Sequence, residues 1–375
     1  MNVVIAIDSL KGSLSSMEAG MAIKEGIRRV HKDASVTIRP LADGGEGTVD
    51  ALVEGMNGTR EQITVTGPLG APVACDYGII ECSKTAIIEM SGAAGITLVP
   101  NEERNPFNTT TYGVGEVILD AMEKGCRRFI VGIGGSATND GGVGMLQALG
   151  YDFLDKDGNQ IPFGAKGLET LASISDDHVI ETVKDCEFYI ACDVTNPLCG
   201  PEGASAIYGP QKGATPEMIT AMDTWLAAYA SLAKESFEHA DATLPGTGAA
   251  GGMGFAFLTF TNATLQSGID LVLQETNLED YVKDADIVIT GEGRLDCQTA
   301  MGKAPIGVAK LAKKYDKKVL AFAGCVTDDA VECNNHGIDA FFPILRSIVT
   351  LDDALNKENA RKNIADTVEQ VFRLL

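Results

Sequence analysis

The chain has 375 residues, 45% of them hydrophobic and 22% charged, which is enough for two ordinary globular domains. Its formal net charge of -22 excludes the basic footprint expected of a nucleic-acid-binding protein and disfavours contact with an anionic membrane surface. We therefore expect neither a nucleic acid nor a membrane as a partner.

Two βα units are predicted at the start of the chain. Residues 3–7 have the pattern of a strand, and in the helix that follows, Ser15 and Glu18 have the spacing of a capping box. Residues 36–39 form a second strand, followed by a helix that starts near Thr48. The loops after these two strands carry three charged residues, Lys11, Asp43 and Glu46.

The middle of the chain is marked by glycine. Residues 129–131 read as a buried strand, and they lead into the Gly-rich loop 132–142. Another apolar run at 188–192 ends at Asp193, and a second Gly-rich segment covers residues 245–254. These segments predict two loops in which the backbone can approach a ligand or another backbone closely.

The C-terminal part returns to alternating strands and helices. Residues 286–290 and 319–323 are predicted strands, and the first of them leads into a loop at 291–296. Strands alternating with helices predict an α/β fold with a doubly wound, mainly parallel sheet.

This alternation also indicates how the domains are arranged along the chain. We expect residues 1–68 and 286–375 to form one discontinuous, Rossmann-like α/β domain. Residues 69–285, which contain the Gly-rich loops, are expected to form a second α/β domain inserted into the first.

The loop 132–142 is the strongest candidate for a binding site. A strand, a Gly-rich loop and a helix N-terminus in succession can bind an anion, most often phosphate. The loop lacks the Gly-Lys-Ser/Thr of a Walker A motif, and a tight turn between two core elements is the alternative interpretation.

Charged residues follow several predicted strands, where open α/β sheets bind their ligands. They are Lys11, Asp43, Glu46, Asp193, Glu292, Arg294 and Asp296. The requirements of phosphoryl transfer match this set, because carboxylates bind Mg²⁺ or accept a proton and cations offset phosphate charge. Alternatively, Asp193 only forms a turn, and Lys11 or Arg294 forms a structural ion pair.

Short motifs along nearly the whole chain resemble the type-1 glycerate kinases. They are DSLKGS at residues 8–13, ADGGEGT at 42–48, GGSATNDGG at 134–142, CDVTNPL at 192–198, PQKG at 210–213, GAAGG at 248–252, TGEGRLD at 290–296 and GK at 302–303. Leu10 departs from the family, which often has Phe there, but no charged position is lost.

The resemblance implies an ATP-dependent, Mg²⁺-requiring kinase that phosphorylates D-glycerate, most often to 2-phospho-D-glycerate. It also implies two α/β domains around a cleft, one of them discontinuous. Glycerate and ATP would then be the small-molecule partners.

Beside this resemblance, we expect a role for each of the charged candidates except Glu292 and for the Gly-rich loops. Catalysis is expected from Asp193 as general base, with Lys11 and Arg294. The expected substrate-binding residues are Asp43, Glu46, Arg294 and Asp296, with Asp43 and Asp296 also as metal ligands. The expected phosphate-binding residues are Gly134, Gly135, Ser136, Thr138, Gly248, Gly251 and Gly252.

Three alternatives to this function stay open. The enzyme could be a glycerate 3-kinase, or a kinase of another small hydroxy acid that uses the same phosphate-handling residues. In a different class, it could be a nucleotide-binding regulator without turnover. Self-association into a homo-oligomer also stays open.

The cellular compartment is predicted from the cysteines and the N-terminal sequence. Nine cysteines without a Cys-x-x-Cys pair favour reduced thiols. Residues 1–8 lack the basic region and cleavage site of a signal peptide, and no apolar run reaches the roughly 18 residues of a membrane span. We therefore expect a cytoplasmic protein.

Overall fold

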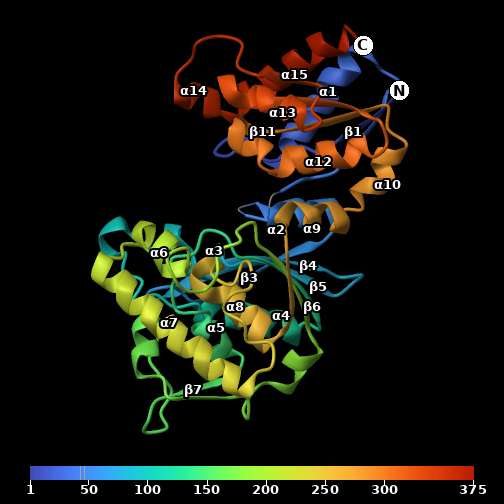
Figure 1. Ribbon diagram of the computed structural model, residues 1–375. Coiled ribbons are helices and arrows are strands. Elements are labelled where there is room, and N and C mark those ends of the chain that lie inside the picture. The colour runs from blue at the N-terminus through green and yellow to red at the C-terminus, as the bar shows by residue number, and fades with distance from the viewer. Residues whose placement is uncertain (43, 46) are drawn as a thin grey trace. The chain divides into compact units, whose positions relative to one another are not determined.

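A computed structural model describes residues 1–42, 44–45 and 47–375, and it confirms the α/β class (Figure 1). The chain forms two compact units. Unit 1 contains residues 1–43, 50–57 and 269–375, and unit 2 contains residues 44–49 and 58–268.

Unit 1 is built on a parallel sheet with the strand order β13-β12-β11-β1-β2. Its strands are β1 (Asn2–Ile5), β2 (Ser35–Ile38), β11 (Ile287–Leu295), β12 (Lys318–Val326) and β13 (Ala340–Pro343). β1 pairs with β2 on one side and with β11 on the other, so the N-terminal strand lies inside the sheet.

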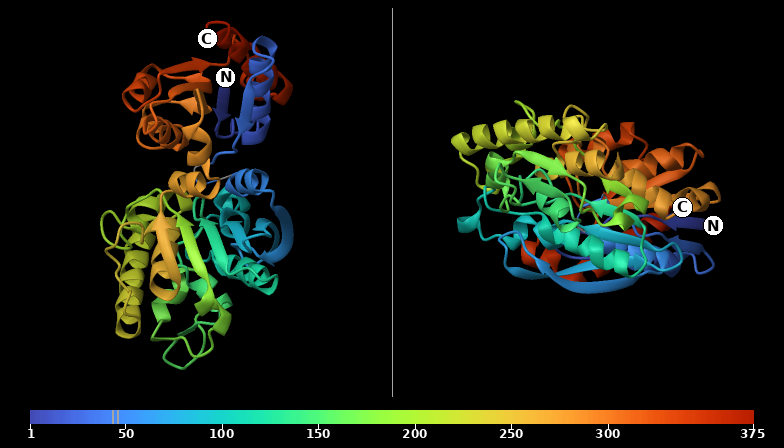
Figure 2. Two further views of the ribbon diagram at one scale, coloured as in Figure 1. Left: turned by 90° about the vertical axis from the view of Figure 1, so that its right-hand side faces the viewer. Right: turned by 90° about the horizontal axis from the view of Figure 1, so that it is seen from below.

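Helices cover both faces of this sheet, as a doubly wound fold requires (Figure 2). Helices α1 (Ser16–Val30) and α15 (Lys357–Phe372) pack together on one face, and α12 (Ala304–Lys313) contacts β11 and β12. The remaining helices that lie in unit 1, wholly or for most of their length, are α2 (Thr48–Met56), α9 (Gly268–Glu275), α10 (Leu278–Lys283), α11 (Cys297–Ala300), α13 (Glu332–Asn335) and α14 (Leu351–Leu355).

The predicted capping box of the first helix is confirmed. The Ser15 side chain accepts a hydrogen bond from the Glu18 backbone N–H at 3.2 Å, and the Glu18 carboxylate accepts one from the Ser15 N–H at 2.8 Å. Two of the backbone donors at the helix start are thereby satisfied.

The prediction of a loop at residues 291–296 is wrong for residues 291–295, which belong to β11. β11 continues to Leu295, because β12 extends beside it and pairs Arg294 with Cys325. Gly291 has a φ of +151°, and a Cβ there would lie 1.8 Å from the Phe322 carbonyl oxygen. Glycine therefore permits the close strand pairing that a sequence pattern does not reveal.

Unit 2 has a mixed sheet with the order β10-β9-β6-β5-β4-β3. Its strands are β3 (Thr59–Thr66), β4 (Pro72–Ile80), β5 (Thr85–Glu89), β6 (Arg128–Gly132), β9 (Glu187–Ala191) and β10 (Asn262–Gln266). The strands β5, β6, β9 and β10 are parallel, whereas β4 and β3 run antiparallel at one edge.

Helices and one hairpin complete unit 2. The helices are α3 (Ser91–Ala94), α4 (Tyr112–Glu123), α5 (Val143–Ala148), α6 (Ala204–Tyr208), α7 (Pro216–Ser236) and α8 (Ala249–Phe260), and the hairpin pairs β7 (Asp152–Leu154) with β8 (Ser173–Ser175). In the core, Phe129 stacks on Phe188 with ring centroids 4.9 Å apart, and Phe257 of α8 lies 5.6 Å from Phe188.

The units differ at their margins from the domains expected at 68/69 and 285/286. β3 pairs along its length with β4, so residues 59–66 lie in unit 2. Residues 269–285, with most of α9 and all of α10, lie in unit 1. None of the helices in the described part of the chain combines the length and the apolar character of a membrane span.

Candidate active site

In unit 2, the Gly-rich loop 132–142 leaves the carboxyl end of β6. Gly134 and Gly135 are exposed, whereas residues 136–142 are buried. Among the described residues, a Cβ on Gly134 would have only the Gly45 Cα within 4 Å, at 3.8 Å, and one on Gly135 would have the Ser91 Cβ at 3.5 Å. The backbone of this glycine pair is therefore accessible to a ligand.

The rest of the loop is fixed by Asp140, which is 1% exposed. Its carboxylate accepts hydrogen bonds from Thr111 N (2.9 Å), Thr111 Oγ1 (2.8 Å), Gly142 N (3.1 Å) and Gly144 N (3.3 Å). Burial raises the pKa of Asp140, although these bonds act in the opposite direction. The sequence predicted that the amides at the start of α5 bind an anionic ligand. In the structure, two of them donate to the protein's own Asp140 carboxylate.

Beneath the same loop lies Lys212, at the end of the short 3-10 helix Pro210–Lys212. Its Nζ donates to Ser136 Oγ at 2.8 Å and to the Thr138 carbonyl oxygen at 2.6 Å. Lys212 is 2% exposed, and burial lowers its pKa to about 7 although nearby Asp140 acts to raise it. Ser136 and Thr138, expected to contact phosphate, therefore contact a buried cation.

The second Gly-rich segment packs against the first. Gly141 N donates to the Gly251 carbonyl oxygen at 2.9 Å, and a Cβ on Gly251 would lie 2.1 Å from the Thr138 carbonyl oxygen. A Cβ on Gly252 would lie 2.8 Å from the Gly141 Cα, and one on Gly248 would lie 2.2 Å from the Pro197 carbonyl oxygen. The three glycines are buried between backbones, unlike Gly134 and Gly135.

Asp193 follows β9, beside β6 in the sheet, and is exposed. Its Oδ1 accepts a hydrogen bond from the Gly268 N at 2.9 Å. The backbone of Gly44 is close to the same strand ends, because a Cβ on it would lie 2.7 Å from Ala191 Cβ and 2.7 Å from Gly268 Cα. Unit 2 thus brings its exposed glycine backbone and one carboxylate to the carboxyl ends of parallel strands.

Unit 1 gathers a second group of charged residues at its own strand ends. Lys11 is exposed in the loop after β1, and its backbone N would lie 3.4 Å from a Cβ on Gly293 of β11. Arg294 Nε lies 3.4 Å from Asp296 Oδ2, and the Arg294 side chain is 62% exposed. The strand ends of unit 1 therefore present both cations of the predicted set.

The carboxylates of this second group also support local structure. Asp296 caps α11 by accepting from Gln298 N (2.9 Å) and Thr299 N (3.2 Å), and Glu292 Oε1 accepts from Thr299 Oγ1 at 2.6 Å. The ion pair anticipated for Arg294 is therefore present, and Asp296 has a structural bond network beside its predicted ligand role.

Two predicted residues, Asp43 and Glu46, lie outside the described residues. Within the described part of the chain, no three or more His, Cys, Asp or Glu side chains form a group able to hold a metal ion. This does not decide the Mg²⁺ prediction, because Mg²⁺ at kinase sites uses one or two carboxylates together with phosphates and waters.

Comparison with known proteins decides the family. The model of the glycerate kinase family matches residues 3–375. The chain is 50% identical over 373 residues to glycerate 2-kinase of Escherichia coli K12, covering 98% of each chain. It is 47% identical over 371 residues to glycerate kinase of Bacillus subtilis 168, covering 99% of this chain and 97% of the relative.

The chain belongs to the glycerate kinase family. The fold agrees, because a crystal structure of a protein provisionally named glycerate kinase 2, from Salmonella typhimurium LT2, matches with a TM-score of 0.93 and 49% identity. That match covers 100% of this chain and 98% of the other. The resemblance read from the motifs is confirmed, and the protein is a kinase.

Sequence reasoning missed two buried charged residues of this kinase. Asp140 and Lys212 both lie in motifs that carried the resemblance, yet neither was expected at the site. The sequence signal for these two residues was a charged side chain next to glycine. A charged side chain is buried only where the fold supplies hydrogen-bond partners for it. Those partners lie as far as 76 positions away in the sequence, so only the fold reveals them.

Proposed function

We propose that this kinase transfers the γ-phosphoryl group of ATP to D-glycerate and that the product is 2-phospho-D-glycerate. The family membership supports the acceptor, and the name of the Escherichia coli relative, glycerate 2-kinase, supports the position. The observation that carries the proposal is the exposed Gly134–Gly135 backbone beside Asp193 at the carboxyl ends of β6 and β9.

The phosphates of ATP bind along the backbone of Gly134 and Gly135, whose amides can approach them without a side chain in the way. Ser136 and Thr138 support that backbone from below through Lys212. Gly248, Gly251 and Gly252 do not contact the phosphates in this proposal. They allow the second Gly-rich segment to pack closely against neighbouring backbone, including that of the first loop.

Asp193 is the proposed general base. Its carboxylate takes the proton of the attacking glycerate hydroxyl, the oxygen forms a bond to the γ-phosphorus, and the bond to the β–γ bridging oxygen breaks so that ADP leaves. The hydrogen bond from Gly268 N orients the carboxylate.

Lys11 and Arg294 supply positive charge in an acidic protein. The forked guanidinium of Arg294 suits the glycerate carboxylate, whereas the ammonium of Lys11 suits the transferring phosphoryl group. Asp43, Glu46 and Asp296 stay predicted substrate ligands. Lys11 and Arg294 belong to unit 1, and Asp193 belongs to unit 2.

Mg²⁺ would neutralise phosphate charge during transfer. Asp296 has the donor type that Mg²⁺ prefers, because it is a carboxylate at the end of a strand. Its Oδ1 caps α11, and its Oδ2 lies 3.4 Å from Arg294 Nε. Asp43 is the second predicted ligand. Chelation with EDTA should abolish turnover, and added Mg²⁺ should restore it.

One assay tests the function. The protein is incubated with ATP, Mg²⁺ and D-glycerate, and the product is identified by ³¹P NMR and by coupling to enolase, which accepts the 2-phosphate directly. Release of ADP with 2-phosphoglycerate supports the proposal. Formation of 3-phosphoglycerate, turnover only with another hydroxy acid, or ATP binding without turnover would each replace it with the corresponding alternative.

A matched pair of variants tests the base. Asp193→Asn should lower kcat by roughly a hundredfold or more, since a general base contributes about 10²–10⁴-fold. Asp157→Asn, in the exposed turn after β7, should leave kcat unchanged. An Asp193→Asn enzyme within a few-fold of wild type removes Asp193 from this role.

We also propose a cytoplasmic location, to be tested by cell fractionation. A homo-oligomer stays a prediction, to be tested by light scattering on the purified protein.

A further inference from the structure

Lys212 is a buried titratable residue that the proposed chemistry does not use directly. Its Nζ donates to two residues of the Gly-rich loop, to Ser136 Oγ at 2.8 Å and to the Thr138 carbonyl oxygen at 2.6 Å. Ser136 is adjacent in sequence to Gly135, the exposed residue proposed to bind phosphate. The amine of Lys212 therefore contacts the residue that follows the candidate phosphate-binding backbone.

The surroundings of Lys212 are unusually polar for a core. Thr138 Oγ1 and Asn139 Oδ1 are buried and have no hydrogen-bond partner among the described residues. The Asn139 Nδ2 donates to Ser205 Oγ at 2.9 Å. This loop therefore exposes glycine backbone on one side and holds concentrated polar atoms on the other.

Few ionisable groups act on Lys212. Asp140, on the loop itself, is the charged group that favours its ammonium form. Tyr229 of α7 is fully buried near Asp140, and burial raises its pKa well above the ordinary value, so it is neutral. Arg104 approaches the next residue through its backbone, since a Cβ on Gly213 would lie 2.2 Å from the Arg104 carbonyl oxygen.

We propose that Lys212 is a positioning residue for the phosphate loop and that its ammonium form is stabilised when the ATP phosphates bind at Gly134–Gly135. The proposal rests on the function proposed above. It follows from the two hydrogen bonds, from complete burial, and from the weak screening of charge in a buried site.

Binding and protonation are then linked. Burial lowers the pKa of Lys212 to about 7, so near pH 8 the free enzyme holds this amine mostly neutral. Negative phosphate charge nearby favours the ammonium form and raises its pKa. ATP binding near pH 8 therefore takes up a proton, and ATP affinity falls as the pH rises above about 7.

Calorimetry measures this uptake. ATP is titrated into the protein near pH 8 in buffers of different ionisation enthalpy, and the slope of the observed heat gives the protons bound. We expect about half a proton or more per ATP for wild type. Lys212→Met, which keeps length but not charge, should reduce the uptake to near zero and raise the KM for ATP roughly tenfold or more.

A control variant distinguishes the loss of the Lys212 amine from the loss of any positive charge on the protein. Lys156 is exposed in the turn after β7, so Lys156→Met should keep the wild-type uptake and KM. The KM for glycerate should stay nearly constant in both variants, whereas general damage to the fold would change both KM values.

The outcomes are distinguishable. No heat of ATP binding by wild-type protein defeats the proposed function itself. Binding without proton uptake, or equal uptake by wild type and Lys212→Met, defeats the inference while leaving the function. Should Lys212→Met fail to fold by circular dichroism, the wild-type protein decides: uptake must grow as the pH rises through about 7, and a flat zero overturns the proposal.

Discussion

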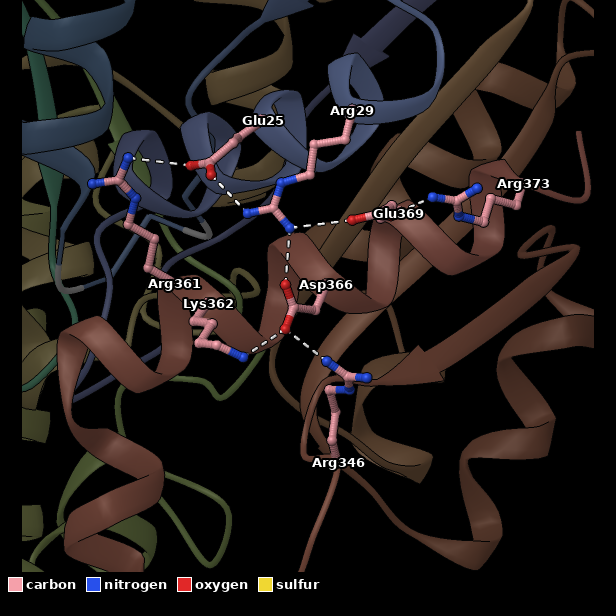
Figure 3. A network of polar contacts seen from close by, with 8 residues as sticks. All are labelled: Glu25, Arg29, Arg346, Arg361, Lys362, Asp366, Glu369 and Arg373. Atoms are coloured by element: carbon pink, nitrogen blue, oxygen red, sulfur yellow. Dashed lines mark hydrogen bonds and ion pairs between the residues drawn. The ribbon is translucent and has the colours of Figure 1, made fainter.

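Two clusters of charged residues, one in each unit, show how differently the same side chains behave in different surroundings. In unit 1, α1 and α15 are joined by a surface network around Arg29 and Asp366 (Figure 3). Arg29 contacts Glu25 at 2.8 Å, Asp366 at 2.8 Å and Glu369 at 3.3 Å. In unit 2, Lys212 and Asp140 are both buried, and each is held mainly by neutral groups.

The pKa shifts favour the charged form of Asp366 in the surface network and disfavour the charged forms of Asp140 and Lys212 in the buried cluster. Hydrogen bonds from Lys362 and Arg29 lower the pKa of Asp366, so its charge is favoured. Burial raises the pKa of Asp140 and lowers that of Lys212, so charge is disfavoured in both. The surface network therefore stays charged over the physiological pH range, whereas the buried cluster can respond to pH and to ligand charge.

The largest effect should come from removing the buried acceptor. Asp140→Asn places amide hydrogens against the donors of Thr111, Gly142 and Gly144, so it should cost about 3 kcal/mol or more in the free energy of unfolding. Denaturant unfolding measures it, with the exposed Asp157→Asn as control. Equal stability of the two variants would show that the buried carboxylate has no special role.

Backbone packing beneath the loop should be nearly as important. Gly251→Ala combines a φ of +69° with a Cβ only 2.1 Å from the Thr138 carbonyl oxygen, so we expect a loss of roughly 2–4 kcal/mol. Gly158→Ala has a φ of +80° and no described atom within 4 Å of the added Cβ, so it should lose only about 1 kcal/mol. Thermal unfolding compares the two, and a smaller loss at Gly251 would argue against the close packing.

The pH dependence of stability should identify Lys212. Its folded pKa of about 7 is below the ordinary 10.5, so between these values the unfolded chain binds more protons and stability rises with pH. The rise is at most about 1.4 kcal/mol per pH unit. Wild type should therefore gain stability relative to Lys212→Met as the pH rises above about 7. A stability difference that is constant with pH would contradict the assignment.

The surface network should contribute least. Asp366→Asn removes the ion pairs to Arg29, Arg346 and Lys362, but these are accessible to solvent, so the loss should be about 1 kcal/mol or less. The loss should shrink further in 1 M salt because screening weakens such pairs. A loss equal to that of Asp140→Asn would remove the contrast between the clusters.

Local sequence signals predicted much of the fold. The alternation of strands and helices, the capping box at Ser15 and the strands leading into the Gly-rich loop all depend on neighbouring residues. The end of β11 could not be predicted in this way, because its Gly-Glu-Gly-Arg sequence is a strand only through pairing with β12. The order of strands in each sheet depends on the same kind of long-range contact.

The site was predicted in part for a similar reason. Exposed strand-end residues such as Lys11, Asp193 and Arg294 can be read from their position after a strand. The buried layer cannot, since Ser136 and Thr138 have side chains that suit phosphate as well as a lysine, and the choice depends on where residue 212 lies. Glycine has the same ambiguity, as Gly134 is exposed and Gly251 is packed.

The position of β1 inside the sheet of unit 1 has a consequence for biosynthesis. Residues 2–5 are translated before unit 2, but their partners at 287–289 in β11 are translated only after the whole of unit 2, which ends at residue 268. Unit 2 can therefore fold during translation, while the N-terminal strand and α1 stay without most of their sheet until the last quarter of the chain emerges. During that interval the apolar side chains of β1 and α1 lack the β11 strand and the α15 helix against which they pack in the folded unit.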